Sequence, residues 1–268
     1  MVSRESAKAD RLRVTCGFWD YLSVPLVYVD VQITCESGIE VRTMKLQVTL
    51  DTYSVEDGIA LVRAIADIVD IIEVGTPLLL DTGMAAVEQV HEAFPQVEVL
   101  ADTKIWHNGA RIAKSAFAHG ADIVTVLAGA TDSEVETVVM VAQEQGGAVA
   151  ADMAGVRGLV QRAAELEDLG VRYLIVPSGL RGKEGLEDDH DVFHRNTRAM
   201  GGTPLALVRN VSRGLTHHAE VAVVDNIRLD NLDQVLATGP GLLLVGRAIL
   251  SADDPVQAAL EFKRRMEQ

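Results

Sequence analysis

An acid and a lysine stand two residues apart at the end of a short apolar segment. Asp102 and Lys104 follow the run at residues 97–101. In an extended strand, side chains two positions apart lie on the same face, so we expect these opposite charges to leave the strand together. The pair is compatible with a weak surface ion pair that ends a strand. Other carboxylates at the ends of apolar runs favour a reaction site instead.

Glu73 is the first of these carboxylates, because it lies inside the apolar run Ile71-Ile72-Glu73-Val74 and must be buried beside a partner. Asp51 and Asp152 each follow an apolar run, and either could alternatively begin a helix. Where strand ends converge, several carboxylates remain ionised together only beside a cation. Such oxygen ligands suit Mg²⁺. A Mg²⁺ ion and Lys104 can together stabilise an enediolate, the intermediate of decarboxylation or aldol cleavage next to a carbonyl.

The elements that would bring these residues together alternate strictly along the chain. We expect strands at residues 45–50, 70–74, 97–101, 122–126, 148–152, 172–176, 220–224 and 242–245. The intervening segments repeat apolar residues at helical spacing, for example at residues 82–94, and a helix at 255–266 closes the chain. This alternation is typical of a (β/α)₈ TIM barrel over residues 44–268. An open doubly wound sheet is the alternative, but the Gly-rich turn usual after its first strand is missing.

Two segments stand outside this alternation. Residues 177–202 form a long Gly-rich and charged loop after the sixth strand, with a helical pattern near 192–200, and loops of this length often act as lids. Residues 1–43 form an N-terminal extension without assigned chemistry. It is compatible with a hairpin packed on the barrel, a loose extension, or translated sequence upstream of a start at Met44.

Composition excludes several classes of function. The net charge is -15 and the pI is about 4.8, so the field repels nucleic acid. No apolar run is long enough to cross a membrane, and no secretion signal precedes the barrel. The two cysteines, Cys16 and Cys35, suggest no disulfide framework. We therefore expect a soluble cytoplasmic protein with neither nucleic acid nor membrane as a partner.

Five motifs together resemble a known group of enzymes. They are Leu50-Asp51, Glu73-Val74-Gly75-Thr76-Pro77, Asp102-Thr103-Lys104, Ala121-Asp122-Ile123-Val124-Thr125-Val126 and Val245-Gly246-Arg247. In this order they are similar to the 3-hexulose-6-phosphate synthase and 3-keto-L-gulonate-6-phosphate decarboxylase group of the orotidine 5'-monophosphate decarboxylase suprafamily. The similarity runs from Met44 to the C-terminus.

The resemblance implies a Mg²⁺-dependent carbon–carbon lyase that forms homodimers and acts on a phosphorylated keto sugar or keto sugar acid. Glu73 and Asp102 match the Mg²⁺ ligands of the group, and Lys104 matches the lysine that stabilises the enediolate. Asp51 matches an acid that contacts substrate. The pair Gly246 and Arg247 matches the phosphate-binding residues, whose backbone amides and guanidinium suit phosphate.

Three positions depart from the pattern of the group. His107 stands where an acid is expected, Pro177 replaces a histidine that transfers protons, and Asp225-Asn226 replaces a Gly-Gly pair that approaches phosphate. A carboxylate repels phosphate, and the loss of glycines should restrict the backbone there. The departures keep two alternatives open: the same machinery with a non-phosphorylated or unusual substrate, and a binding barrel without catalysis.

Replacements for the missing groups are present in the sequence. We expect His107 to act as a catalytic proton carrier, since histidine titrates near neutral pH. The loop histidines His190 and His194 are alternatives, and the loop cations Arg181 and Lys183 could complete the phosphate site. All four loop residues are equally compatible with solvated charges.

Overall fold

The computed structural model describes residues 43–51, 54–180, 205–216 and 218–268. Residues 1–42 of the expected extension lie outside the described residues. The loop residues Arg181, Lys183, His190 and His194, and the helical pattern near 192–200, also lie outside them.

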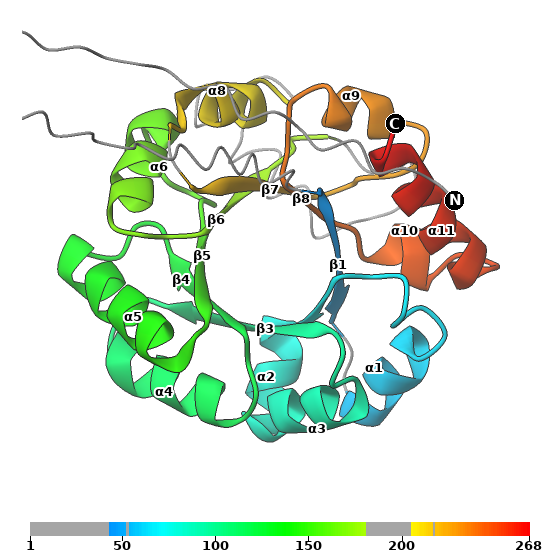
Figure 1. The fold of residues 1–268 in the computed structure, drawn as a ribbon, viewed down its shortest axis with the longest axis horizontal. Helices are drawn as coiled ribbons and strands as arrows, with labels where there is room; N and C mark the ends of the chain where they lie inside the picture. Colours follow the sequence, from blue (N-terminus) through cyan, green and yellow to red (C-terminus); the bar gives the residue numbers. More distant parts are fainter. Residues whose placement is uncertain (1–42, 52–53, 181–204, 217) are drawn as a thin grey trace, which may run out of the picture. The chain divides into compact units, whose positions relative to one another are not determined.

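Eight parallel strands close into a barrel in the order of the sequence (Figure 1). The strands are β1 (Lys45–Leu50), β2 (Ile71–Val74), β3 (Glu98–Ile105), β4 (Ile123–Leu127), β5 (Ala148–Asp152), β6 (Tyr173–Pro177), β7 (Glu220–Val224) and β8 (Leu242–Leu244). β1 pairs with both β2 and β8, which closes the sheet on itself. The predicted TIM barrel is therefore confirmed, and the open doubly wound sheet is excluded.

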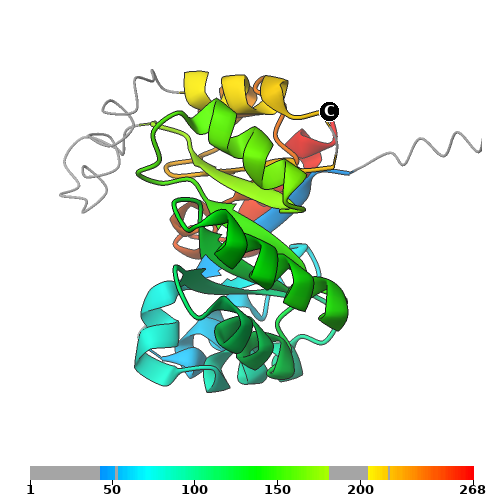
Figure 2. The same ribbon diagram turned by 90° about the vertical axis from the view of Figure 1, so that its left-hand side faces the viewer.

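Helices surround the barrel on its outside, and Figure 2 shows α4, α5 and α6 running side by side. The helices are α1 (Val55–Val62), α2 (Thr76–Thr82), α3 (Ala85–Ala93), α4 (Gly109–Ala118), α5 (Asp132–Gln145), α6 (Leu159–Asp168), α8 (Ala206–Gly214), α9 (Leu232–Leu236), α10 (Arg247–Leu250) and α11 (Pro255–Met266). Within the described residues, none of them has the length and apolar character that a bilayer crossing requires.

The helix expected over residues 82–94 corresponds to α3, whereas α2, which precedes it, was not predicted. α2 begins directly after β2, with Gly75 as N-cap and Pro77 in the first turn, a position that proline favours. It ends at Gly83, whose φ of 74° interrupts the helix before α3. The helix therefore starts at the mouth of the barrel, close to the strand ends that carry the candidate site.

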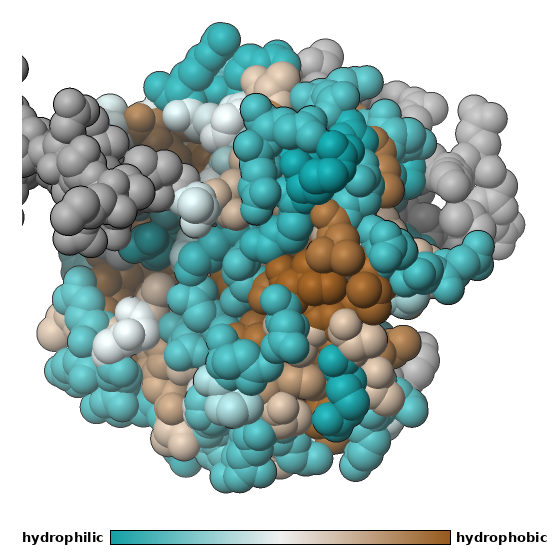
Figure 3. All heavy atoms as spheres, turned by 45° about the vertical axis from the view of Figure 1, so that its right-hand side comes forward, coloured by the Kyte–Doolittle hydropathy of each residue, from teal (hydrophilic) through white to brown (hydrophobic). Residues whose placement is uncertain are grey.

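The buried residues form two apolar layers. One cluster contains residues of the strands only and fills the barrel interior, with Ile71, Leu100 and Tyr173 among its members. The larger cluster lies between the strands and the helices. Apolar side chains also reach the surface where α1, α10 and α11 lie, as the brown area of Figure 3 shows, and Leu61 and Leu260 are among the exposed ones.

Candidate active site

A polar layer lies directly above the apolar interior of the barrel, because side chains on one face of a strand recur every second residue. Four strands each place an apolar residue in the interior cluster and a polar residue two positions later. The pairs are Ile71 and Glu73 on β2, Leu100 and Asp102 on β3, Ile123 and Thr125 on β4, and Ala150 and Asp152 on β5. The carboxyl ends of these strands thus place polar groups at one end of the barrel, where the active sites of TIM barrels lie.

Lys104 joins two of these carboxylates. Its Nζ lies 3.0 Å from Oδ2 of Asp102 and 2.9 Å from Oδ2 of Asp152. Burial alone would lower the pKa of Lys104, but the Asp102 and Asp152 carboxylates outweigh it and raise that pKa above its usual value. Because the Asp102 side chain is only 8% exposed, the pair is not the surface ion pair that its spacing also allowed. Lys104 is therefore a fixed positive charge at the mouth of the barrel.

The segment that carries Asp102 and Lys104 is irregular. We expected β3 to end at Ala101, but it continues to Ile105. Ala101 pairs with Val124 and Ile105 pairs with Val126, so a bulge separates the two regular parts of the β3–β4 ladder. Lys104 has a φ of 43°, in the left-handed region. The two side chains meet as expected, but simple alternation along a regular strand is not the reason.

Glu73 is 7% exposed, and its contacts come from β1. Its Oε2 accepts hydrogen bonds from Gln47 Nε2 at 2.5 Å and from Thr49 Oγ1 at 2.8 Å. Burial and the nearby Asp102 carboxylate raise the pKa of Glu73 to about 8, with a smaller contribution from Asp51. The sequence predicted that the buried Glu73 needs a partner, and the structure provides two neutral hydrogen-bond donors, Gln47 and Thr49.

Asp102 is held by two threonines from neighbouring elements. Thr76 Oγ1 donates to its Oδ2 at 2.6 Å, and Thr125 Oγ1 donates to its Oδ1 at 2.8 Å. Sequence reasoning missed these threonines, as it missed Gln47 and Thr49. The sequence could have identified Thr125, because it is the one polar residue of the apolar strand β4, and Gln47, because it lies between two apolar residues of β1.

Glu73 and Asp102 fit a divalent cation. The charge on Asp102 raises the pKa of Glu73, and a cation between the two carboxylates would remove this repulsion. Among the described residues, no group of three or more histidine, cysteine or acidic side chains is arranged as a metal site. A site with two carboxylates suits Mg²⁺, which usually keeps several water ligands.

Asp51 lies beside the start of α2. A Cβ atom at Gly75 would stand 2.2 Å from Asp51 Oδ1 and 2.8 Å from the Leu50 carbonyl oxygen, so only glycine fits there. Neither Asp51 nor Asp152 begins a helix, because the N-caps are Ser54 for α1 and Gly158 for α6. The helix-capping alternative is thus wrong for both acids.

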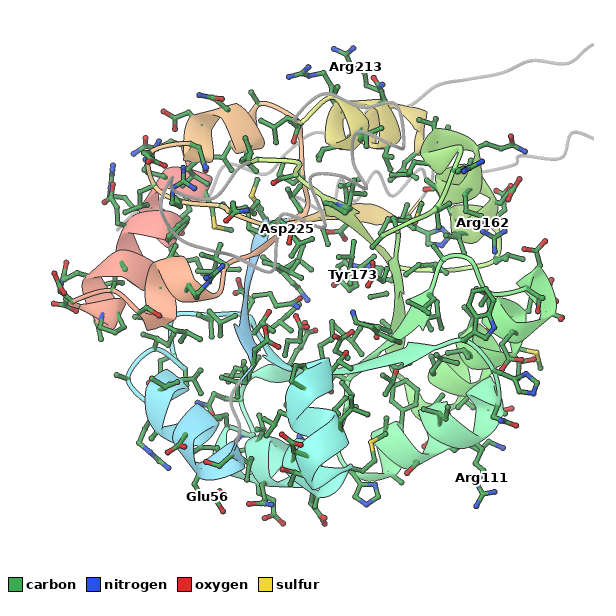
Figure 4. All side chains as sticks on the ribbon, turned by 180° about the vertical axis from the view of Figure 1, so that it is seen from behind. Glu56, Arg111, Arg162, Tyr173, Arg213 and Asp225 are labelled. Atoms are coloured by element: carbon green, nitrogen blue, oxygen red, sulfur yellow. The ribbon has the colours of Figure 1, made fainter. Side chains whose placement is uncertain are left out.

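The Asp225-Asn226 pair forms a tight turn after β7. Their φ angles are 74° and 50°, in the left-handed region that glycine adopts most readily. Asp and Asn adopt this conformation more readily than other side chains. Ser178 Oγ donates to the Asp225 carbonyl at 2.5 Å, directly after Pro177, and Asn231 Nδ2 donates to the Asn226 carbonyl at 2.8 Å. In Figure 4, Asp225 lies towards the inside of the ring.

The remaining candidates directly follow β8 and β3 in the sequence. Gly246 and Arg247 begin α10 at the end of β8, where a Cβ on Gly246 would contact nothing and the Arg247 side chain is exposed. The His107 side chain is 77% exposed, and its Nδ1 lies 3.7 Å from Oε2 of Glu134. The structure therefore brings together Glu73, Asp102 and Lys104, but not His107.

Comparisons with known proteins agree with this geometry. A model of the Orotidine 5'-phosphate decarboxylase / HUMPS family matches residues 44–262. A 3-hexulose-6-phosphate synthase from Staphylococcus epidermidis is 34% identical over 224 residues, which cover 84% of this chain and 99% of the relative.

Two solved structures share the fold over most of their length. The 3-hexulose-6-phosphate synthase from Salmonella typhimurium has a TM-score of 0.71 at 31% identity, covering 84% of this chain and 99% of that one. The 3-keto-L-gulonate-6-phosphate decarboxylase from Vibrio cholerae has a TM-score of 0.70 at 25% identity, covering 84% and 98%. The resemblance found in the sequence motifs is confirmed, and the chain belongs to the Orotidine 5'-phosphate decarboxylase / HUMPS family.

Proposed function

We propose that this chain is a Mg²⁺-dependent carbon–carbon lyase that acts on a phosphorylated keto sugar or keto sugar acid. The observation that carries the proposal is the Lys104 ammonium, which lies between the Asp102 and Asp152 carboxylates and close to the buried Glu73. The relatives named as 3-hexulose-6-phosphate synthases and 3-keto-L-gulonate-6-phosphate decarboxylases support this class of reaction and of substrate.

Glu73 and Asp102 would hold the Mg²⁺ ion, which when bound supplies a positive charge that polarises substrate oxygens. Lys104 remains protonated and stabilises negative charge on a substrate oxygen. The bond next to the carbonyl breaks and its electron pair stays on the substrate as an enediolate, which then takes up a proton. Carbon dioxide leaves directly from a carboxylate, whereas an aldehyde leaves as its hydroxyl proton passes to a base, the role we give to His107. Both reactions use the same intermediate and the same three residues.

Substrate binding falls to residues around this centre. We assign Asp51 to the sugar hydroxyl groups, because its carboxylate lies at the end of β1 beside Gly75. We assign the phosphate to Gly246 and Arg247, since backbone amides and a guanidinium match its oxygens. The open space at Gly246 supports this assignment.

We propose that the protein forms homodimers and that His107 carries protons for a site in the partner copy. The exposed side chains near His107 support this proposal. His107 lies outside the Lys104 cluster of the same copy, and the neighbouring Trp106 side chain is 58% exposed. Leu80 on α2, which packs against β3, is 81% exposed. Large exposed apolar side chains mark interaction surfaces where they form a contiguous patch.

The second candidate is the same reaction on a non-phosphorylated substrate, and the Asp225 carboxylate in the turn after β7 favours it. A binding barrel without catalysis is less consistent with this site, because a buried charged cluster without a role tends to destabilise a fold.

A turnover screen with Mg²⁺ tests the proposal. It compares hexulose 6-phosphate and 3-keto-gulonate 6-phosphate with their non-phosphorylated counterparts, and follows formaldehyde and carbon dioxide. Lys104→Ala should abolish turnover. Lys45→Ala is the matched control, because Lys45 pairs with Glu98 at the opposite end of the barrel and its loss should leave turnover intact. Turnover that survives Lys104→Ala would refute the proposal.

A further inference from the structure

We propose that Thr125 is a positioning residue that holds both Asp102 and Lys104 in their reactive geometry. The proposal rests on the proposed function, since Lys104 is the group that acts on the substrate. We infer this role from a structural fact: one buried threonine contacts each residue of the irregular segment in β3.

Thr125 is the β4 residue that lies opposite the bulge in the β3–β4 ladder. Between the pairs Ala101–Val124 and Ile105–Val126, three residues of β3 stand opposite one residue of β4. That residue is Thr125, and its side chain is fully buried. A bulge of this kind leaves backbone groups without ladder partners, so another group must satisfy them.

Thr125 supplies a partner to all three residues of the bulge. Its Oγ1 donates to Asp102 Oδ1 at 2.8 Å and accepts the Lys104 backbone N–H at 2.8 Å. Its carbonyl oxygen accepts the Thr103 hydroxyl at 2.8 Å. A hydroxyl can donate and accept at once, which an aliphatic side chain cannot do.

The bond to the Lys104 amide opposes backbone strain. A φ of 43° is unfavourable for a residue with a side chain, and it persists only where surrounding contacts fix it. The same backbone conformation aims the Lys104 side chain at Asp102 and Asp152. Without the Thr125 hydroxyl, the amide would lose its partner and the backbone would relax towards an ordinary strand.

The sharpest test compares Thr125→Ser with Thr125→Ala, which differ by one oxygen atom. Since a displacement of about 1 Å can cost about 10²-fold in rate, we expect Thr125→Ala to lower kcat by about 10²-fold and Thr125→Ser to stay within a few-fold of the wild type. Substrate KM should change much less than kcat, because Thr125 does not contact the substrate. The isosteric Thr125→Val should behave like Thr125→Ala.

Thr238→Val is the matched control, because Thr238 is a buried threonine far along the chain whose hydroxyl donates to the Val235 carbonyl. It should lower thermal stability without changing kcat. Equal, measurable turnover by Thr125→Ala and Thr125→Ser would overturn the proposal.

A second measurement does not depend on turnover. Hydrogen exchange of the Lys104 amide should be about tenfold faster in Thr125→Ala than in Thr125→Ser, because only the serine keeps its acceptor. If no substrate is turned over but the exchange rates differ, the proposed function fails while the positioning by Thr125 stands. Unchanged exchange in Thr125→Ala overturns the positioning itself.

Discussion

The ammonium of Lys104 lies 2.9 Å from Oδ2 of Asp152, a residue 48 positions later at the end of β5. Asp152 is itself held in place, because its Oδ1 accepts the Ala154 backbone N–H at 2.9 Å. The contact links the third and fifth strands across the mouth of the barrel. It also gives Lys104 a second carboxylate besides Asp102, so that loss of either one still leaves the ammonium paired.

Asp152→Asn should lower the pKa of Lys104, because one of the two carboxylates that raise it is lost. A lower pKa increases the fraction of neutral amine at a fixed pH, by about tenfold for each unit. Labelling of Lys104 by an amine-acylating reagent, followed by mass spectrometry, should therefore be faster in the variant. Asp132→Asn is the control, since Asp132 pairs with Arg162 and not with Lys104. Equal labelling rates in wild type and Asp152→Asn would contradict this assignment.

The raised pKa of Glu73 predicts how stability depends on pH without divalent ions. Below about pH 4.5 the carboxyl is protonated in both the folded and the unfolded chain. Between 4.5 and about 8 the unfolded chain ionises first, so the free energy of unfolding should fall as pH rises and level off above 8. Urea unfolding at several pH values should show a fall on the order of a few kcal/mol that Glu73→Gln removes. Glu165→Gln, which changes a half-exposed carboxylate, should retain it.

Magnesium should reverse this loss, because the ion binds the ionised carboxylate and competes with its proton. The increase in Tm on adding Mg²⁺ should be larger at pH 8 than at pH 6. At a Mg²⁺ concentration of 100 times Kd the stabilisation should be about 2.7 kcal/mol. Glu73→Gln should abolish most of the increase, and an equal increase in that variant would place the ion elsewhere.

The barrel and its charged centre follow from local patterns in the sequence. Apolar strands in strict alternation with helices predict the closed sheet, and Glu73 inside an apolar run predicts a buried carboxylate. The same alternation, read two residues past each interior apolar side chain, locates Asp102 and Asp152 at the mouth of the barrel.

The bulge in β3 could not be predicted in this way. It arises from the pairing of β3 with β4, so it depends on Thr125, which lies 21 residues after Lys104. The contact between His107 and Glu134 of α5 likewise joins two separate segments. Composition and spacing describe each segment alone, whereas these features are set by contacts between segments.

The Asp225 carboxylate in the turn after β7 should weaken the binding of phosphorylated substrates. Asp225→Gly removes a carboxylate and supplies the residue that best tolerates a φ of 74°. If phosphate lies near this turn, the KM for a phosphorylated substrate should fall by about fivefold with little change in kcat, since removing a repulsion on the order of 1 kcal/mol has that effect. Asp225→Asn separates the two causes, because it removes the charge but keeps a side chain. A KM that is unchanged in both variants would favour a non-phosphorylated substrate.

A substitution at Gly75 tests where the Asp51 carboxylate lies. Gly75→Ala would place a Cβ 2.2 Å from Asp51 Oδ1 and 2.8 Å from the Leu50 carbonyl oxygen, which the backbone cannot yield easily. Overpacking of this kind costs about 1–3 kcal/mol, so Tm should fall, and the displaced Asp51 should raise the KM of the substrate. Asp51→Asn, measured in parallel, shows how much of the change in KM comes from the carboxylate alone. Wild-type KM in Gly75→Ala together with a raised KM in Asp51→Asn would mean that Asp51 acts from another position than the one described.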